Sequence, residues 1–338
     1  MKARFTLPVL CLSGIAVLSA AQDRPEGSRP SFSEWLAGVR ADALDRGIRP
    51  DIVDQALATV EEPEPTVIER DRSQAETVLP LERYVARTLR PIVVRTAREM
   101  SARHHKVLTE VGDRYGVSPR IIVGIWGIES NFGKFSGVRP TIGALATLAW
   151  DPRRAAFFRG ELLNAMQILD RGDIDVARMR GSWAGAMGQP QFMPSSYLKW
   201  AEDFDEDGRS DIWSSPPDVF ASIANYMKAH GWKTGQAWGR EVTISRAVAT
   251  VIANDVERRK GSCSARRNMT VALPMARWQK LGVRLTNGAA LPKTDFTASL
   301  VSGSSRHFLV YDNYDALLEY NCAHSYAISV ALLADRTR

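Results

Sequence analysis

Cysteine is scarce in this chain, and internal repeats, membrane-length hydrophobic runs and strongly basic tracts are missing. A chain of 338 residues with three cysteines is not a small scaffold held together by disulfides. The excess of 44 lysine and arginine residues over 38 acidic ones is mild and spread out, which argues against a nucleic-acid partner. A content of 45% hydrophobic and 24% charged residues excludes wholesale disorder. We therefore expect a folded protein with one large or two modest cores.

The first 21 residues have the layout of a secretory signal peptide. Lys2 and Arg4 precede an apolar run over residues 7–18, and small residues follow it. The run is too short to span a bilayer, so a single membrane anchor is the weaker alternative. Cys11 lies inside the run and not at a cleavage site, which argues against a lipoprotein. We expect a soluble, periplasmic protein whose net charge falls from +6 to +4 when the signal is cleaved.

Export would leave two cysteines, Cys263 and Cys322, in an oxidising compartment where paired thiols persist as disulfides. We therefore predict a bond between them. The closed loop of about 60 residues corresponds to a stabilisation of about 4 kcal/mol in the chain-entropy estimate. The alternative is two separate buried thiols, and one cysteine pair is not a metal site by itself.

The remaining chain divides into segments of different composition. A polar stretch at 22–31, rich in Pro and Gly, predicts a flexible leader, and helical spacing interrupted by prolines predicts an N-terminal helical region at 32–115. The region 116–238 is also mostly helical, and its part up to residue 235 holds six of the nine tryptophans. Period-two alternation predicts a small β-rich section at 239–314. A final helix at 315–338 is expected to return to the core, which makes the fold class mainly α, of the α+β type.

An acidic residue stands near the end of the most apolar helical segment. Ser118 and Pro119 predict where this helix begins, and Asn131 and Gly133 predict where it ends. Glu129 borders the apolar stripe, with no cation three or four positions away. Burial without a cation raises the pKa of a carboxyl, so Glu129 is a candidate general acid. Two alternatives stay open: Glu129 reaches solvent at the helix end, or it pairs with an arginine from elsewhere.

A second stretch, residues 181–197, combines glycines with amides, hydroxyls, a thioether and aromatic rings. Glycines let the main chain approach a ligand closely, and the neutral donors and acceptors suit an uncharged polar ligand such as a glycan. Aromatic rings stack on sugar faces, although core packing is the commoner role of any single tryptophan. A turn before a helix that begins near Pro194 explains part of the same composition.

Together these motifs resemble the family B lytic murein transglycosylases, glycoside hydrolase family 103. The resemblance covers most of the chain and rests on Gly127–Gly133, Ala184–Tyr197, Ala224–Tyr226, His230–Trp232 and Tyr320–Asn321. It implies a lysozyme-like catalytic core within 116–238, no cofactor for catalysis, and Glu129 as the sole catalytic acid and base.

The resemblance also implies which residues line a glycan cleft. These matching positions are Ser182, Gln191, Met193, Asn321 and Tyr326. Two positions depart from the family's pattern. Phe157 stands where relatives often have Tyr, which removes one hydroxyl from a substrate contact. Cys322 follows Asn321, so the predicted disulfide would tether the cleft asparagine.

An acidic loop at 203–211 matches the opening half of an EF-hand calcium loop. Carboxylates occupy positions one, three, five and nine and a glycine occupies position six, but Ser214 stands at position twelve in place of the bidentate Glu. Asp218 is available to close the site, and the resemblance implies an altered calcium loop of this kind. The candidate metal ligands are Asp203, Asp205, Asp207, Arg209 and Asp218. The alternative is a solvated acidic turn. A calcium ion here would hold the loop and would not take part in bond cleavage.

The resemblance implies non-hydrolytic cleavage of the β-1,4 bond between N-acetylmuramic acid and N-acetylglucosamine in peptidoglycan. Glu129 would protonate the leaving oxygen, the N-acetyl carbonyl would stabilise the sugar cation, and Glu129 as base would then draw the 6-hydroxyl onto C1. Asp151 and Glu161 are the other acids considered. The alternatives are a hydrolytic muramidase and a non-catalytic, calcium-dependent glycan-binding protein.

The expected partners are peptidoglycan strands, with cell-wall enzyme complexes as a further candidate. We expect a monomer that ends with its final helix and carries no appended wall-anchoring module.

Overall fold

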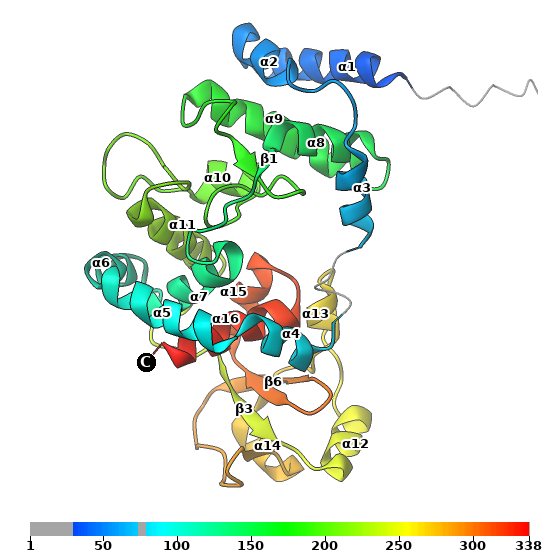
Figure 1. Ribbon diagram of the computed structural model, residues 1–338. Helices are drawn as coiled ribbons and strands as arrows, with labels where there is room; N and C mark the ends of the chain where they lie inside the picture. The colour runs from blue at the N-terminus through cyan, green and yellow to red at the C-terminus, as the bar shows by residue number, and fades with distance from the viewer. Residues whose placement is uncertain (1–29, 74–78, 338) are drawn as a thin grey trace, which may run out of the picture.

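The structure, a computed structural model, describes residues 30–73 and 79–337. Within these residues the protein is mainly helical and has a small antiparallel sheet, which confirms the predicted fold class (Figure 1). The predicted signal peptide and most of the predicted leader lie outside the described residues. Over the described part of the chain, no helix is both long enough and apolar enough to cross a membrane.

The N-terminal helices begin where cap residues and prolines stand. Ser31 and Glu34 form a capping box at the start of α1. Proline occupies the first position of α2, α3, α5 and α7, where its missing N–H costs nothing. The bounds are α1 (Phe32–Asp45), α2 (Pro50–Leu57), α3 (Pro65–Arg72), α4 (Leu81–Thr88), α5 (Pro91–Arg103), α6 (His105–Tyr115) and α7 (Pro119–Ser130).

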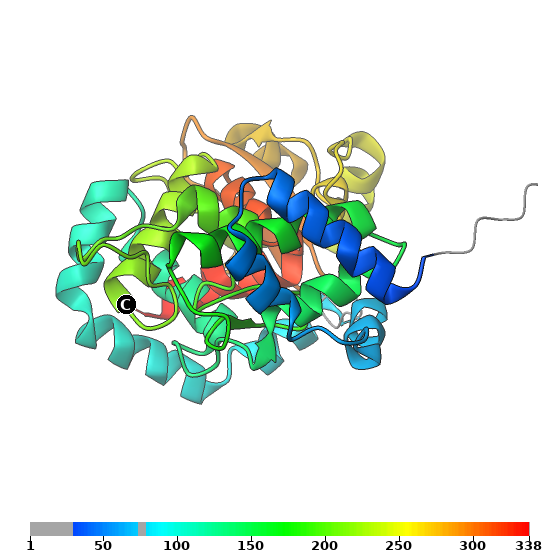
Figure 2. The same cartoon turned by 90° about the horizontal axis from the view of Figure 1, so that it is seen from above.

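Further helices and a short strand pair follow α7. Helices α8 and α9 pack against each other, and α1 and α2 lie across α9 (Figure 2). Strands β1 and β2 pair antiparallel and bring the chain after α7 next to the start of the loop that leads to α10. The bounds are β1 (Arg139–Pro140), α8 (Thr141–Trp150), α9 (Ala155–Arg171), β2 (Arg180–Gly181), α10 (Pro194–Trp200) and α11 (Pro216–Ala229). Helix α10 begins at Pro194, as predicted.

A second, smaller core lies at the opposite end of the molecule from α1 and α2 (Figure 1). An antiparallel sheet of order β4-β6-β7-β3-β5 forms it, and Trp278 is fully buried there with its indole N–H on the Ala298 carbonyl. The bounds are β3 (Gly239–Thr243), α12 (Arg246–Asp255), α13 (Ser264–Arg267), β4 (Leu273–Pro274), α14 (Met275–Leu281), β5 (Arg284–Leu285), β6 (Thr297–Ser302) and β7 (His307–Val310). The section expected to be β-rich therefore also contains the helices α12, α13 and α14.

The C-terminal segment differs from the single helix that we expected. It forms α15 (Asp312–Tyr320) and α16 (His324–Arg336), separated by an extended backbone at Asn321 and Ala323. The predicted disulfide between Cys263 and Cys322 is present in this break, with a Cα–Cα distance of 5.7 Å.

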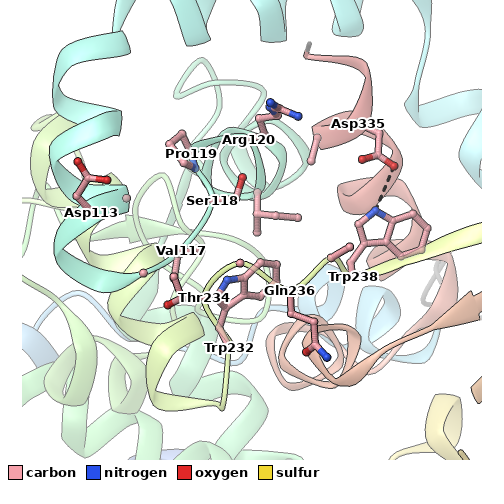
Figure 3. Close-up of a pocket in the computed structure, with 16 residues that line it drawn as sticks. Asp113, Val117, Ser118, Pro119, Arg120, Trp232, Thr234, Gln236, Trp238 and Asp335 are labelled. Carbon is pink, nitrogen blue, oxygen red and sulfur yellow. Dashed lines mark hydrogen bonds between the residues drawn. The ribbon is translucent and has the colours of Figure 1, made fainter. Parts of the chain in front are cut away.

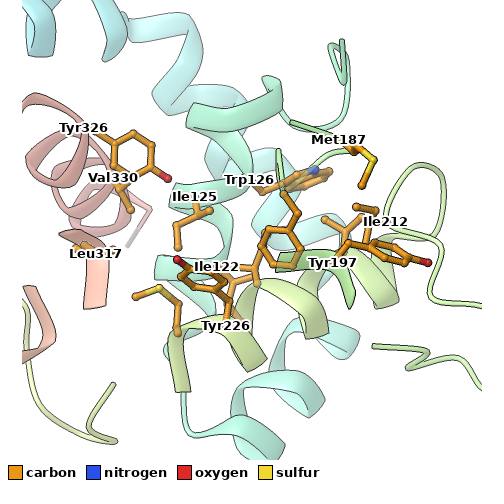
Figure 4. Close-up of a cluster of buried hydrophobic side chains, with 14 of the residues drawn as sticks. Ile122, Ile125, Trp126, Met187, Tyr197, Ile212, Tyr226, Leu317, Tyr326 and Val330 are labelled. Carbon is orange, nitrogen blue, oxygen red and sulfur yellow. The ribbon is translucent and has the colours of Figure 1, made fainter. Parts of the chain in front are cut away.

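Helix α7 lies at the centre of the main core and packs against α5, α11 and α16. Gly124 permits the close approach to α16, because a Cβ there would lie 2.8 Å from the Val330 carbonyl oxygen. Figure 4 shows Ile122, Ile125 and Trp126 of this helix among buried side chains from several other elements. A helix enclosed in this way gives its last turn a fixed position.

Candidate active site

The turn that ends α7 fixes where Glu129 stands. Residues 131–133 all have a left-handed backbone, with φ values of 50°, 61° and 76°. The Ser130 hydroxyl donates to the Trp126 carbonyl at 3.0 Å and accepts the Gly133 N–H at 3.1 Å. The helix thus ends at the residues that the sequence indicated, with Glu129 in its last turn.

A buried amide connects this helix end to the acidic loop. The Gln189 side chain accepts the Trp126 indole N–H at 2.7 Å and donates to the Trp213 carbonyl at 2.8 Å, while its backbone N–H donates to Ile212 at 2.8 Å. A Cβ at Gly133 would lie 2.4 Å from its Oε1 atom, so only glycine fits beside it. Gln189 is 7% exposed, which makes these hydrogen bonds costly to break.

Two phenols stand within electrostatic range of the Glu129 carboxylate. Burial, and after it the charge of Glu129, raise the pKa of Tyr326 and of Tyr320 well above the ordinary value of a phenol. Both side chains therefore stay protonated and uncharged. Their rings are nearly parallel, with centroids 6.2 Å apart, and the Tyr320 hydroxyl donates to the Pro190 carbonyl at 2.7 Å. These contacts bring α15, α16 and the glycine-rich loop next to the end of α7.

A cavity of about 400 Å³ opens beside the half-buried Glu129. One wall is the end of α7 with Asn131 and the exposed ring of Phe135, and the other is the junction of α4 and α5. Its volume is that of an ordinary small-ligand site. The cavity places the Glu129 carboxyl where a bound ligand can reach it.

The glycine-rich loop is held by its own polar side chains. The Ser182 hydroxyl accepts the N–H groups of Ala184 and Ala186, at 3.2 and 3.1 Å. The Gln191 side chain, on a left-handed residue with φ 54°, donates to the Gly188 carbonyl at 2.8 Å. Both predicted cleft residues therefore also shape the loop that carries them.

The other predicted cleft residues differ in their surroundings. Met193 and Asn321 are half-buried, at the start of α10 and at the end of α15. Tyr326 is buried next to Glu129. Phe157, on α9, is 52% exposed, and its ring packs edge-on against Phe158 at a centroid distance of 5.0 Å.

The two other acids considered as catalytic groups serve the fold. Glu161 is buried and accepts both the backbone N–H and the hydroxyl of Ser195, at 2.8 and 2.6 Å, at the start of α10. Asp151 accepts the Arg153 N–H at 3.0 Å and lies 3.6 Å from the guanidinium of Arg72.

The acidic loop gathers three carboxylates at one point. Oxygens of Asp203, Asp205 and Asp218 lie within 4.8 Å of one another. Burial, and secondarily the charge of Asp205, raise the pKa of Asp218 to about 6, although it accepts the N–H groups of Phe204 and Asp211 at 2.7 and 2.8 Å. An all-oxygen set whose buried member resists ionisation by itself fits a hard cation such as calcium.

The remaining predicted metal ligands lie outside that group of three. The Asp207 carboxylate accepts the Arg209 N–H at 2.9 Å, in a turn of the exposed loop tip. Their part in binding a cation stays a prediction.

A second cavity, of about 430 Å³, lies at the opposite end of α7 (Figure 3). Trp232 and Trp238 line it, and the Trp238 indole N–H donates to Asp335 at 3.1 Å. Because Ile121, the last residue of α7 that lines this cavity, is eight residues before Glu129, roughly 12 Å of helix separates the two. It is not the site that Glu129 serves.

Sequence reasoning gave no role to Gln189 or to the arginines at the α4–α5 junction. Gln189 lies inside the glycine-rich motif, but its partners come from positions 63 and 24 residues away. Arg87 and Arg90 carried no motif at all.

The chain matches known proteins over most of its length. Residues 31–335 match the transglycosylase SLT domain family. The membrane-bound lytic murein transglycosylase B of Escherichia coli is 42% identical over 154 residues, which are 45% of this chain and 42% of that protein. In that match the chain therefore spans less than half of its relative.

Solved structures match more of the chain. SltB3 of Pseudomonas aeruginosa, in a complex with NAG-anhNAM-pentapeptide, is 41% identical with a TM-score of 0.79, over 90% of this chain and 79% of that one. Slt35 of Escherichia coli, in a complex with calcium, is 26% identical with a TM-score of 0.73, over 92% and 93%. The chain therefore belongs to the transglycosylase SLT domain family, in agreement with its resemblance to the family B lytic murein transglycosylases.

Proposed function

We propose that the protein is a lytic transglycosylase that cleaves the β-1,4 bond between N-acetylmuramic acid and N-acetylglucosamine in peptidoglycan. The observation that carries this proposal is the position of Glu129, in the last turn of an enclosed helix and on the wall of a 400 Å³ cavity. Membership of the family and the likeness to SltB3, which was solved with a murein fragment, support the same substrate class.

In the proposed reaction Glu129 acts first as acid and then as base. Its proton passes to the leaving glycosidic oxygen, and the N-acetyl carbonyl of the substrate stabilises the sugar cation. The Glu129 carboxylate then takes the proton of the 6-hydroxyl as that oxygen bonds to C1, which gives a 1,6-anhydro end. The neutral phenol of Tyr326 is a suitable neighbour, because it adds polarity without a second charge.

The proposed reaction needs one carboxyl group, and the two other candidate acids have structural partners elsewhere. Asp151 and Glu161 are engaged by Arg72 and Ser195, away from the Glu129 cavity. We assign glycan binding to Ser182, Gln191, Met193 and Asn321, with Phe157 as an apolar contact further out.

The acidic loop is proposed to hold a structural calcium ion through Asp203, Asp205 and Asp218. Calcium would supply charge that lets three carboxylates stay ionised close together. It has no part in the chemical step. Gln189 connects the loop to α7, so an ordered loop also helps to hold the helix end.

We further propose export to the periplasm through the N-terminal signal, where peptidoglycan strands are the partner. The protein would act there as a monomer, alone or within a cell-wall enzyme complex.

Digestion of purified sacculi followed by mass spectrometry of the fragments tests the proposal. Fragments that end in anhydro-muramic acid, lighter by one water than reducing ends, are the expected product. Reducing ends would identify a muramidase instead. Binding to sacculi without any released fragment would identify a glycan-binding protein and overturn the assignment.

A further inference from the structure

The cavity beside Glu129 has a basic wall that the proposed reaction does not use. Arg87 lies in the last turn of α4 and Arg90 immediately precedes α5, and both line the cavity. Both side chains are exposed. Within residues 30–73 and 79–337, neither has an ion pair with an acidic side chain, whereas Arg139, Arg159 and others do.

These two arginines belong to a row of like charges. Arg83 and Arg87 lie four residues apart on α4, and Arg90 follows two positions after the helix ends. Like charges at a spacing of four residues destabilise a short helix by a few tenths of a kcal/mol. The positive charge of Arg87, in the last turn of α4, stabilises that helix through its interaction with the helix dipole. Arg90 lies beyond the helix and does not stabilise it in this way.

We propose that Arg87 and Arg90 form a subsite for the carboxylates of the peptide that is attached to the glycan. The inference rests on the proposed function and names the part of the substrate that the cavity takes besides sugar. Guanidinium groups bind carboxylates through paired N–H donors, and an uncharged sugar gives no reason for two cations. The ring of Phe135, 59% exposed in the same cavity, offers an apolar face to the short side chains of such a peptide.

The subsite has a consequence for the reaction. Glu129 shares the cavity with Arg87 and Arg90, so a peptide held by the arginines has its attached sugar beside the acid. Binding energy from this remote part of the substrate positions the bond that breaks.

The test compares two glycan strands of the same length. One carries stem peptides with free carboxylates, and the other carries the same peptides with those groups converted into carboxamides, which are similar in shape and uncharged. Release of fragments by the full-length protein is measured for wild type, for the double variant Arg87→Gln/Arg90→Gln, and for Arg83→Gln. The last variant is the control, because it removes one arginine charge from α4, one turn before Arg87, without touching the cavity lining.

We expect the double variant to lose at least about tenfold in kcat/KM on the carboxylate strands and less than about threefold on the amidated strands. Arg83→Gln should leave kcat/KM unchanged on both kinds of strand. The wild-type preference for carboxylate strands over amidated strands should decrease as the salt concentration is raised. If the double variant loses kcat/KM equally on both kinds of strand, the arginines have a structural role. If it loses kcat/KM on neither, they bind no part of the substrate. Either result overturns the inference and leaves the proposed function intact. A wild type that releases nothing from either strand overturns both.

Discussion

Replacement of Gln189 by leucine tests whether the buried amide holds the catalytic helix in place. Gln189→Leu keeps most of the volume and removes both side-chain hydrogen bonds. The Trp126 indole N–H and the Trp213 carbonyl then lose their partner in a buried place. Each unsatisfied group costs about 1–3 kcal/mol, so the free energy of unfolding should fall by about 2–6 kcal/mol.

The same change should lower kcat more than it raises KM. Trp126 lies one helical turn before Glu129, and Gly133 packs against the amide just after it. A shift of this turn moves the carboxyl relative to the bond that breaks, and a displacement near 1 Å costs on the order of a hundredfold in rate. We expect kcat to fall at least about tenfold. The assays are denaturant unfolding followed by tryptophan fluorescence, and fragment release from sacculi.

Gln189→Glu is the informative comparison. The protonated carboxyl can accept from Trp126 and donate to Trp213, whereas the carboxylate cannot donate. Burial raises the pKa of the introduced group, so its contribution to stability is present below the ordinary Glu value near 4.3 and is lost as the pH rises through the raised pKa. The deficit relative to wild type should therefore be small near pH 4 and grow toward pH 7. A leucine variant with wild-type stability and kcat would refute the reasoning.

Three further predictions concern the acidic loop, the disulfide and the turn after α7. In Asp218→Asn the calcium-induced rise in Tm should vanish. Without metal, the wild-type Tm should fall as the pH rises through about 6, because the raised pKa of Asp218 means that the folded protein favours the protonated carboxyl. The Tm of Asp218→Asn should not show this fall with pH. Cys322→Ser should lower the free energy of unfolding by about 4 kcal/mol, and reductant should have the same effect on wild type. Gly133→Ala should lower kcat, because its Cβ would lie 2.4 Å from Gln189, whereas Gly47→Ala, with a similar positive φ and open space around it, should cost only stability. Denaturation curves and fragment release check all three, and equal kcat values for the two alanine variants would contradict the last.

Local signals in the sequence predicted local structure well. The start and end of α7 and the start of α10 follow from proline, cap residues and left-handed positions, because these act within one turn. The disulfide was predicted from the expectation that export leaves two cysteines, and the structure contains it. The break between α15 and α16 was missed, since the apolar pattern continues through Asn321 and only the extended backbone separates the two helices.

Long-range contacts account for what the sequence could not predict. The partners of Gln189 come from an earlier helix and a later loop, and nothing in the local pattern marks them. Arg87 and Arg90 line the cavity of Glu129 because the α4–α5 junction folds next to the end of α7, and the sequence gives no sign of this contact. Phe157 is the opposite case. The family pattern links this residue to the cleft, whereas in the structure its ring contacts Phe158 on the same helix.

The role of Glu129 is tested most directly by the turnover of Glu129→Gln on purified peptidoglycan strands, with Asp151→Asn as the matched loss of a carboxylate elsewhere. The amide has nearly the same shape and cannot deliver a proton. The account predicts that kcat falls by on the order of 10²–10⁴-fold while the strands still bind, and that Asp151→Asn keeps near wild-type turnover. Undiminished release of anhydro fragments by Glu129→Gln would contradict it.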